Sequence, residues 1–133
     1  MYRLQILLAI VFSLTASAEP LGEPATNACY MNYPNLEGEL LLENEHVVVQ
    51  RFTIDPGQWE GIHRHPPNQL YIQITDGDWI YQSSGTTEKF SMASGDISWN
   101  ESGTELSEQH QSRNAGSQPI SYLWIAIKPD CLE

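Results

Sequence analysis

Short runs of hydrophobic and β-branched residues, separated by turn signals, make up most of the chain beyond its N-terminal region. No stretch keeps the 3.6-residue period of an amphipathic helix for three turns. Many short strands divided by Gly, Pro, Asn and Asp are typical of an all-β sandwich or barrel. We therefore expect strands at 38–43, 46–54, 69–75, 78–84, 86–92, 97–99 and 120–128.

Residues 1–18 have the pattern of a secretory signal peptide. Arg3 gives the N-terminal region a positive charge. The apolar run 4–14 that follows is too short to cross a bilayer of about 30 Å as a helix. The run is followed by Ala-Ser-Ala, a small-x-small cleavage pattern that ends at Ala18. We predict cleavage after Ala18 and export to the periplasm or the extracellular space, with an uncleaved anchor as the alternative. No second apolar stretch is long enough to cross a membrane, so no membrane partner is expected after cleavage.

A chain of 133 residues fits a single domain. Residues 19–36 are rich in Pro, Gly and Asn and show no period, which indicates a linker or N-terminal arm. The β-domain is then expected to span 37–133.

Charge and cysteine content restrict the partners and the redox state. The formal net charge is −11, and removal of Arg3 with the signal peptide gives −11 − 1 = −12. Such an acidic chain repels phosphate backbones and anionic membranes, so no nucleic-acid partner is expected. Cys29 and Cys131 are the two cysteines. In an exported protein they favour a disulfide, worth roughly 4 to 5 kcal/mol in the chain-entropy model; free thiols or a metal pair are the alternatives.

Residues 57–77 read as two strands and a turn, and they contain His63, His65 and Gln69. Side chains two apart in a strand point to the same face, so both imidazoles can approach one metal ion. A lone His-x-His is a weak signal, because it is common on exposed strands. His110 is the only histidine further downstream and supplies a third imidazole. His46 begins a strand beside acidic residues and is interpreted as solvated.

The spacing of these residues resembles the two motifs of the cupin superfamily. The first is matched by Gly57, five residues, His63-x-His65, three residues, and Gln69; the second by Gly95 and by His110 with Asn114 three residues further on. Gln69 stands where the family has Glu, and the loop before His110 is longer than in the family pattern. The resemblance extends over 40–128 and is strongest to small single-domain cupins of uncharacterised function.

The resemblance implies a cupin-type jelly-roll β-barrel with a metal inside. It implies His63, His65 and His110 as ligands and Gln69 at the fourth position. Imidazole ligands suit a divalent transition metal such as Fe, Mn, Ni, Cu or Zn, and the sequence does not choose among them. A degenerate cupin without metal is the alternative. Cupins often pair through strand edges, so a homodimer is expected by analogy.

Tyr71 shares the inward face of Gln69 and is the candidate catalytic hydroxyl, with core packing as the alternative. Glu60 and Arg51 could reach the barrel mouth and are assigned no role. The sequence contains no nucleophile elbow, phosphate loop or dinucleotide fingerprint. The first functional hypothesis is a metal-dependent enzyme, of dioxygenase, isomerase or lyase type, acting on a small carboxylated or sugar-derived molecule. The others are a non-catalytic module that binds a small molecule or carbohydrate, and a bare structural β-domain.

Overall fold

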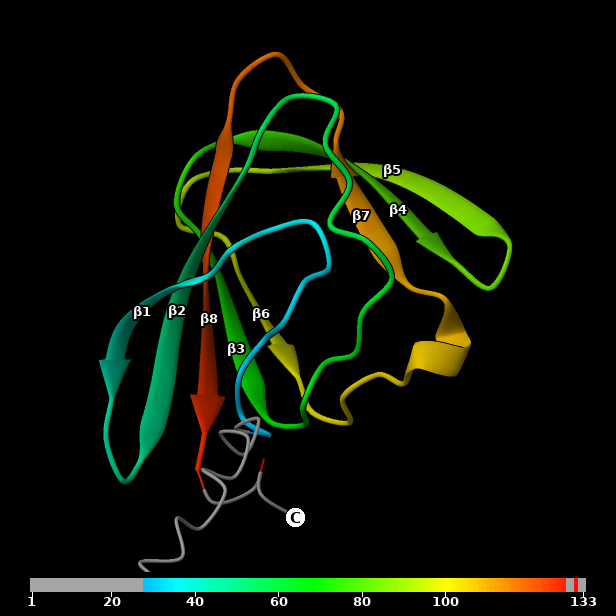
Figure 1. Ribbon diagram of the computed structural model, residues 1–133. Helices are drawn as coiled ribbons and strands as arrows, with labels where there is room; N and C mark the ends of the chain where they lie inside the picture. The colour runs from blue at the N-terminus through cyan, green and yellow to red at the C-terminus, as the bar shows by residue number, and fades with distance from the viewer. Residues whose placement is uncertain (1–27, 129–130, 132–133) are drawn as a thin grey trace, which may run out of the picture.

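The computed structural model describes residues 28–128 and residue 131. Within this part the chain forms two antiparallel sheets (Figure 1). The larger sheet has the order β1 (Glu39–Glu43), β2 (Val47–Ile54), β8 (Ile120–Ile127), β3 (Gln69–Gln73) and β6 (Ile97–Asn100). The smaller sheet has the order β5 (Thr86–Met92), β4 (Gly77–Ser83) and β7 (Gln111–Asn114), and a short 3-10 helix, η1 (Leu106–Glu108), precedes β7.

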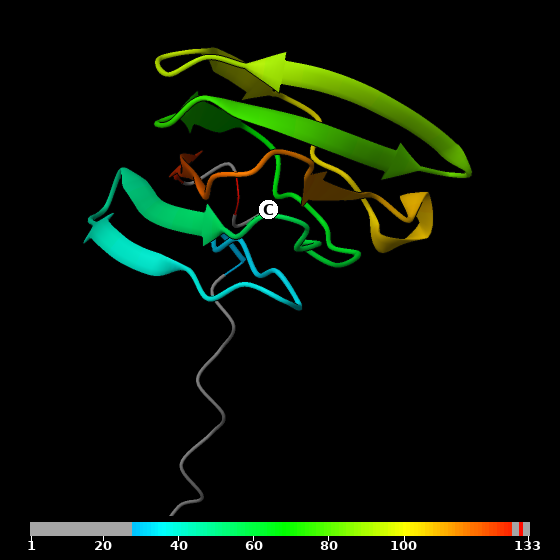
Figure 2. The same cartoon turned by 90° about the horizontal axis from the view of Figure 1, so that it is seen from above.

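The strands alternate between a core face and an outer face. In β8 every second residue from Ile120 to Ala126 is buried, and those between are half-buried. β2 and β3 follow the same two-residue period, as the geometry of an extended chain requires. The pair β4–β5 lies in a separate layer from the pair β1–β2 (Figure 2). Aromatic rings, among them Phe52, Tyr122 and Trp124, fill much of the core.

The long loop 55–68 between β2 and β3 runs along the free side of β7 (Figure 1). The backbone N–H of Gly57 donates to the carbonyl of Asn114 at 2.8 Å, and that of His63 donates to the carbonyl of His110 at 3.3 Å. These hydrogen bonds extend the smaller sheet by one irregular segment. They place His63 beside His110, the residue that directly precedes β7.

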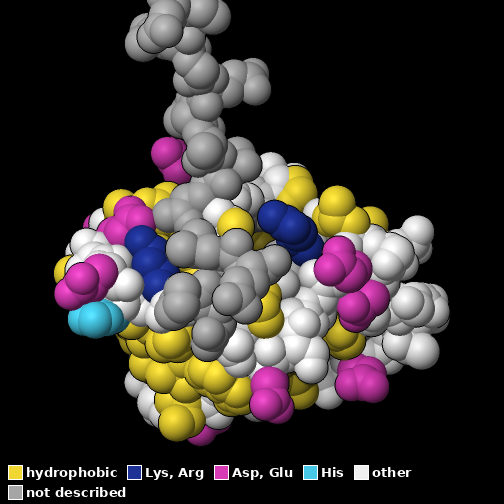
Figure 3. Space-filling view, turned by 90° about the horizontal axis from the view of Figure 1, so that it is seen from below, with side chains coloured by type: hydrophobic (Ala, Val, Ile, Leu, Met, Phe, Trp, Pro, Cys, Tyr) yellow, Lys and Arg dark blue, Asp and Glu magenta, His cyan; other side chains and the backbone are white. Residues whose placement is uncertain are grey.

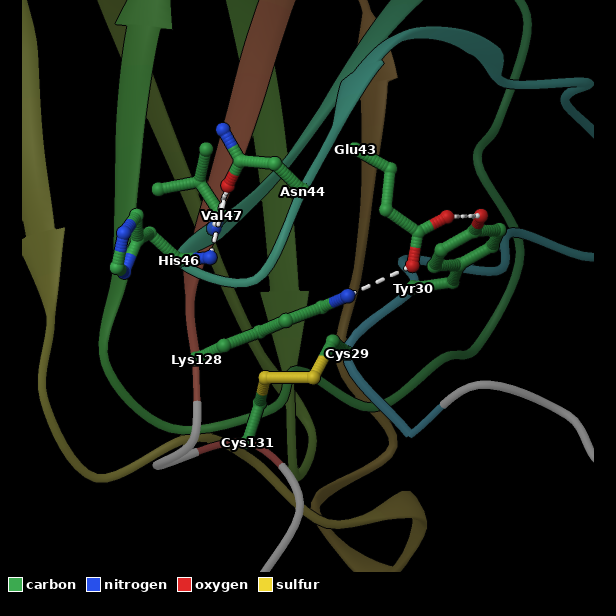
Figure 4. A network of polar contacts seen from close by, with 8 residues as sticks. All are labelled: Cys29, Tyr30, Glu43, Asn44, His46, Val47, Lys128 and Cys131. Carbon is green, nitrogen blue, oxygen red and sulfur yellow. Dashed lines mark hydrogen bonds and ion pairs between the residues drawn. A yellow bond between two sulfur atoms is a disulfide. The ribbon is translucent and has the colours of Figure 1, made fainter.

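The predicted disulfide between Cys29 and Cys131 is present and joins the two ends of the domain (Figure 4). Both cysteines are buried. Beside them the hydroxyl of Tyr30 donates to Glu43 at 2.5 Å, and the ammonium of Lys128 pairs with the same carboxylate at 2.7 Å. The arm, the end of β1 and the end of β8 are thereby fastened together.

The described part of the predicted linker or arm, 28–36, packs against the larger sheet. Gln50 binds the backbone of Met31 in both directions, accepting from its N–H at 2.8 Å and donating to its carbonyl at 3.2 Å. Met31 and Tyr33 are buried members of the core. The arm therefore supplies core side chains to the domain that was expected to begin at 37.

The prediction of an all-β, jelly-roll type fold is confirmed, with two facing sheets in the described residues instead of one closed ring of strands. The prediction omitted β7 and η1. The predicted signal peptide at 1–18 lies outside the described residues. Within the described part, no helix has the length and apolar character needed to cross a bilayer.

Candidate metal centre

His63 and His65 lie in the loop 55–68 and not on a regular strand, which corrects the sequence interpretation of this segment. His65 nevertheless forms an isolated antiparallel β-bridge with Thr104. His63 and His65 are buried while Arg64 between them is exposed. The two imidazoles therefore point inward together, as expected, although the ladder that holds them is irregular. Pro66 and Pro67 follow directly and donate no backbone hydrogen bond, which limits the ladder at this point.

The structure brings the three predicted histidine ligands together. His63, His65 and His110 are buried, and each offers a ring nitrogen within 4.8 Å of the others. The rings of His65 and His110 are stacked with centroids 4.8 Å apart, and His63 meets His110 edge-on at 4.4 Å. Three imidazoles that converge in this way form a set of ligands for one transition-metal ion.

Hydrogen bonds define which ring nitrogens are free to bind a metal. Nδ1 of His63 lies 2.8 Å from the carbonyl oxygen of Gly61, which can only accept, so Nδ1 carries the proton. Nδ1 of His65 lies 3.2 Å from Oε1 of Gln69 and donates in the same way. In both rings the unprotonated nitrogen is then Nε2, and these two atoms are 3.0 Å apart.

Two bare nitrogens at 3.0 Å cannot hydrogen-bond to each other, and their lone pairs repel unless a cation lies between the rings. His110 also has a ring nitrogen without a hydrogen bond: its Nδ1 is buried and has no partner among the described residues. The residues therefore fit a metal ion. The outer hydrogen bonds fix His63 and His65 in the tautomer that a metal site requires.

Burial also keeps these imidazoles neutral. It lowers the pKa of His63 to about 4 and that of His65 to about 3, from an ordinary value of 6.5. The pKa of His110 is lowered for the same reason. Since only a neutral imidazole can bind a metal, the three ligands are in the competent state at neutral pH.

Gln69, expected at the fourth ligand position, is fully buried at the start of β3. Its Oε1 accepts from Nδ1 of His65, and its Nε2 has no partner among the described residues. In this arrangement the amide orients His65. The predicted direct bond from Gln69 to the metal stays a prediction.

A cavity of about 590 Å³ lies beside the histidine cluster, between the two sheets. His65, His110 and Glu60 form part of its wall. Aromatic residues, among them Tyr71, Trp79 and Trp124, make up much of the remaining wall. No Lys or Arg is found among the described residues that line it.

Glu60, to which the sequence analysis assigned no role, is a buried carboxyl group. Its Oε1 accepts from the hydroxyl of Tyr122 at 2.7 Å, and its Oε2 accepts from the backbone N–H of Ser112 at 3.1 Å. Burial raises the pKa of Glu60 from 4.5 to about 7. At neutral pH this group can therefore either accept or donate a proton beside the cavity. The signals for it in the sequence were its position three residues before His63 and its expected reach to the barrel mouth.

Tyr71 points inward from β3 and lines the same cavity, in the orientation predicted for it. Its ring stacks on Tyr122 at 5.4 Å and meets Trp124 edge-on at 5.0 Å. Its hydroxyl donates to Gln73. Burial raises the pKa of this hydroxyl, so Tyr71 holds its proton more firmly than Glu60 does. The catalytic role assigned to Tyr71 remains a prediction.

No protein-family model and no curated protein sequence matches the chain. Solved structures do. A cupin domain from Bordetella pertussis Tohama I is 22% identical, with a TM-score of 0.62 over 74% of this chain and 99% of that one. A Cupin 2 conserved barrel domain protein from Salinispora arenicola is 19% identical, with a TM-score of 0.54 over 87% and 94% of the two chains.

A third similar structure is the DMSP lyase DddQ from Ruegeria pomeroyi, which is 16% identical. Its TM-score is 0.54, and the match covers 71% of this chain and 48% of that one. At these identities the similarity establishes the fold alone. Together with the two facing sheets, these matches show that the chain has the double-stranded β-helix fold of the cupin domains.

Proposed function

We propose that this protein is an exported, metal-dependent enzyme that converts a small molecule in the cavity between its sheets. The observation that carries the proposal is the pair of unprotonated Nε2 atoms of His63 and His65, 3.0 Å apart. His110 completes the set, and the cavity gives a substrate access to it. The signal-peptide pattern at 1–18 and the disulfide between Cys29 and Cys131 support export.

In this proposal His63, His65 and His110 hold a divalent transition metal such as Fe, Mn, Ni, Cu or Zn, and Gln69 orients His65. A metal held by neutral ligands supplies a Lewis acid that can bind an anionic oxygen of the substrate. The cavity wall has no Lys or Arg among its described residues, so the metal is the main positive charge available there. This favours a substrate with one carboxylate over a molecule with several anionic groups.

Glu60 is the group we assign to proton transfer. It is buried, its two oxygens are held in place by Tyr122 and Ser112, and it lines the cavity with His65 and His110. A carboxyl group with a pKa of about 7 is suited to general acid–base catalysis near neutral pH. Tyr71 forms an aromatic wall of the same cavity and stays a second candidate for proton transfer.

The test is elemental analysis of the protein purified without chelator. We expect about one transition-metal ion per chain, lost when His63→Ala and His65→Ala are combined. His46→Ala is the matched control, because His46 is exposed and pairs with Glu45 away from the cavity. Absence of metal, even after loading with Fe, Mn, Ni, Cu and Zn, would exclude the metalloenzyme.

A non-catalytic binding module is the second candidate, favoured by the aromatic wall of Tyr71, Trp79 and Trp124. Such rings stack on the apolar faces of sugars and other small ligands. Such a module can exist with or without metal. Under that alternative tryptophan fluorescence would respond to a ligand, no turnover would be observed, and Glu60→Gln would change only the affinity for the ligand.

A further inference from the structure

The N-terminal arm, 28–36, runs beside the loop 55–68 that carries the first two histidine ligands (Figure 2). Asn35 fastens the two segments together. Its backbone N–H donates to the carbonyl of Glu60 at 3.2 Å, and its side-chain amide donates to the carbonyl of Trp59 at 3.0 Å. The arm is therefore bonded to the stretch of the loop that directly precedes the metal site.

The close approach of the two segments explains a glycine in the loop. Gly61 has a φ of +84°, which other residues rarely adopt, and a Cβ there would lie 2.9 Å from Cβ of Pro34 on the arm. The carbonyl of Gly61 accepts the hydrogen bond from Nδ1 of His63. The backbone group that sets the tautomer of His63 is thus packed directly against the arm.

Tyr33, on the same arm, contacts the ring of His63 itself. The two ring centroids are 4.4 Å apart, and the rings meet edge-on. The hydroxyl of Tyr33 accepts from Nε1 of Trp124 at 2.7 Å, and the ring of Trp124 in turn meets that of His65 edge-on at 4.6 Å. One residue of the arm is therefore connected to two of the three predicted ligands, to His63 directly and to His65 through an indole.

A residue that orients a ligand must itself be held in place. Tyr33 is 7% exposed, and its ring meets that of Phe52 edge-on at 4.7 Å. Two residues earlier, Gln50 binds both backbone groups of Met31, and the disulfide at Cys29 fastens the start of the arm. Seen from below, the surface shows histidine only near one margin (Figure 3), in agreement with the burial of the three ligands. Contacts within the protein, and not water, therefore set the orientation of these rings.

We propose that Tyr33 is a positioning residue of the metal site, which holds the ring of His63 in the orientation and tautomer that a metal ligand needs. The proposal rests on the metal site proposed above and gives the arm a part in building it. Groups that orient a metal-binding imidazole typically contribute about 10- to 100-fold to metal affinity. If Tyr33 only fills the core, its removal destabilises the fold and leaves the metal affinity of the folded protein unchanged.

The test is Tyr33→Leu, which removes the ring and keeps an apolar side chain. Zn²⁺ affinity of the full chain is measured by chelator competition, and the ring nitrogens of His63 are followed by ¹⁵N NMR of metal-free protein at neutral pH. We expect wild type to show one tautomer, with the proton on Nδ1. The variant should show averaged nitrogen signals and about 10-fold weaker Zn²⁺ binding. Tyr33→Phe keeps the ring and should restore both properties.

Tyr30→Leu is the matched control, because it makes the same change in the same arm. Tyr30 bonds to Glu43, on the far side of the arm's anchor from the histidines, and this variant should keep wild-type signals and affinity. Circular dichroism checks that each variant is folded. If Tyr33→Leu is misfolded, Asn35→Ala takes its place, because Asn35 is exposed and its side chain holds the loop at Trp59. It should shift the same signals in the same direction.

The two measurements separate this proposal from the proposed function. A wild-type protein that binds no Zn²⁺ would count against the metal site, while the NMR signals of metal-free protein would still show whether the arm positions His63. A folded Tyr33→Leu variant that keeps the wild-type signals of His63, or the wild-type affinity where wild type binds Zn²⁺, would overturn the positioning role.

Discussion

Replacing Glu60 by glutamine isolates the free-energy cost of ionising a buried carboxyl group in the cavity. The folded pKa of Glu60 is raised by burial to about 7, above the ordinary value of 4.5. Below pH 4.5 the group is protonated in both the folded and the unfolded chain. Between 4.5 and about 7 the unfolded chain has lost this proton while the folded chain keeps it. Stability from this group is therefore full at low pH and is lost as the pH rises through that window.

The magnitude follows from the difference between 4.5 and about 7. At 1.36 kcal/mol for each pKa unit, wild-type protein loses about 3 kcal/mol of stability from Glu60 across the window. Glutamine has nearly the same shape and does not ionise. Its oxygen can still accept from the N–H of Ser112, and its amide can donate to the hydroxyl of Tyr122. We expect Glu60→Gln to match wild type near pH 4.5 and to exceed it by about 3 kcal/mol above pH 7.

The assay is urea unfolding of metal-free protein, with chelator present, at a series of pH values. Wild type and variant share every other titrating group, so the difference between their unfolding free energies reports Glu60 alone. A constant difference from pH 4.5 to 7 would refute the reasoning, because it would show that the carboxyl group titrates equally in both states. A variant more stable at neutral pH but inactive would agree with a functional role for the buried carboxyl.

Three further predictions concern the histidines, their support and the disulfide. Since the pKa values of His63 and His65 are about 4 and 3 when folded, metal-free protein should lose several kcal/mol as pH falls below 6.5, and a flat melting profile there would contradict this. Gln69→Ala should weaken metal affinity about 10- to 100-fold by releasing Nδ1 of His65, as measured by chelator competition; unchanged affinity would exclude the orienting role. Replacing Cys29 and Cys131 by serine opens a bond between residues 102 apart and should cost about 5 kcal/mol in unfolding free energy, and a loss below about 1 kcal/mol would contradict the entropic account.

Much of the fold was predictable because period and turn chemistry are local signals. The strands at 47–54 and 120–127 agree within one residue with the predicted 46–54 and 120–128, since each is rich in β-branched and aromatic residues. β7 was missed because its four residues, Gln-Ser-Arg-Asn, contain no apolar side chain. Its strand character comes from pairing with β4 and from the loop beside it.

The histidine cluster was predictable from spacing, whereas its surroundings were not. Glu60 becomes notable only when the hydroxyl of Tyr122, 62 residues away, meets its carboxylate. Tyr33 was placed in a linker, yet its ring contacts that of His63 with centroids 4.4 Å apart. Both facts depend on contacts between distant parts of the chain, which a local pattern does not encode.

Adjacent residues of β3 face opposite sides of the sheet, because side chains alternate along an extended strand. Gln69 and Tyr71 are buried on the inner side, while Leu70 between them is half-buried and pairs with Ile125 and Trp99. The residues that support the metal site on β3 are therefore separated from the outward residues of the same strand. Gln69→Ala should lower metal content while leaving that outward row unchanged.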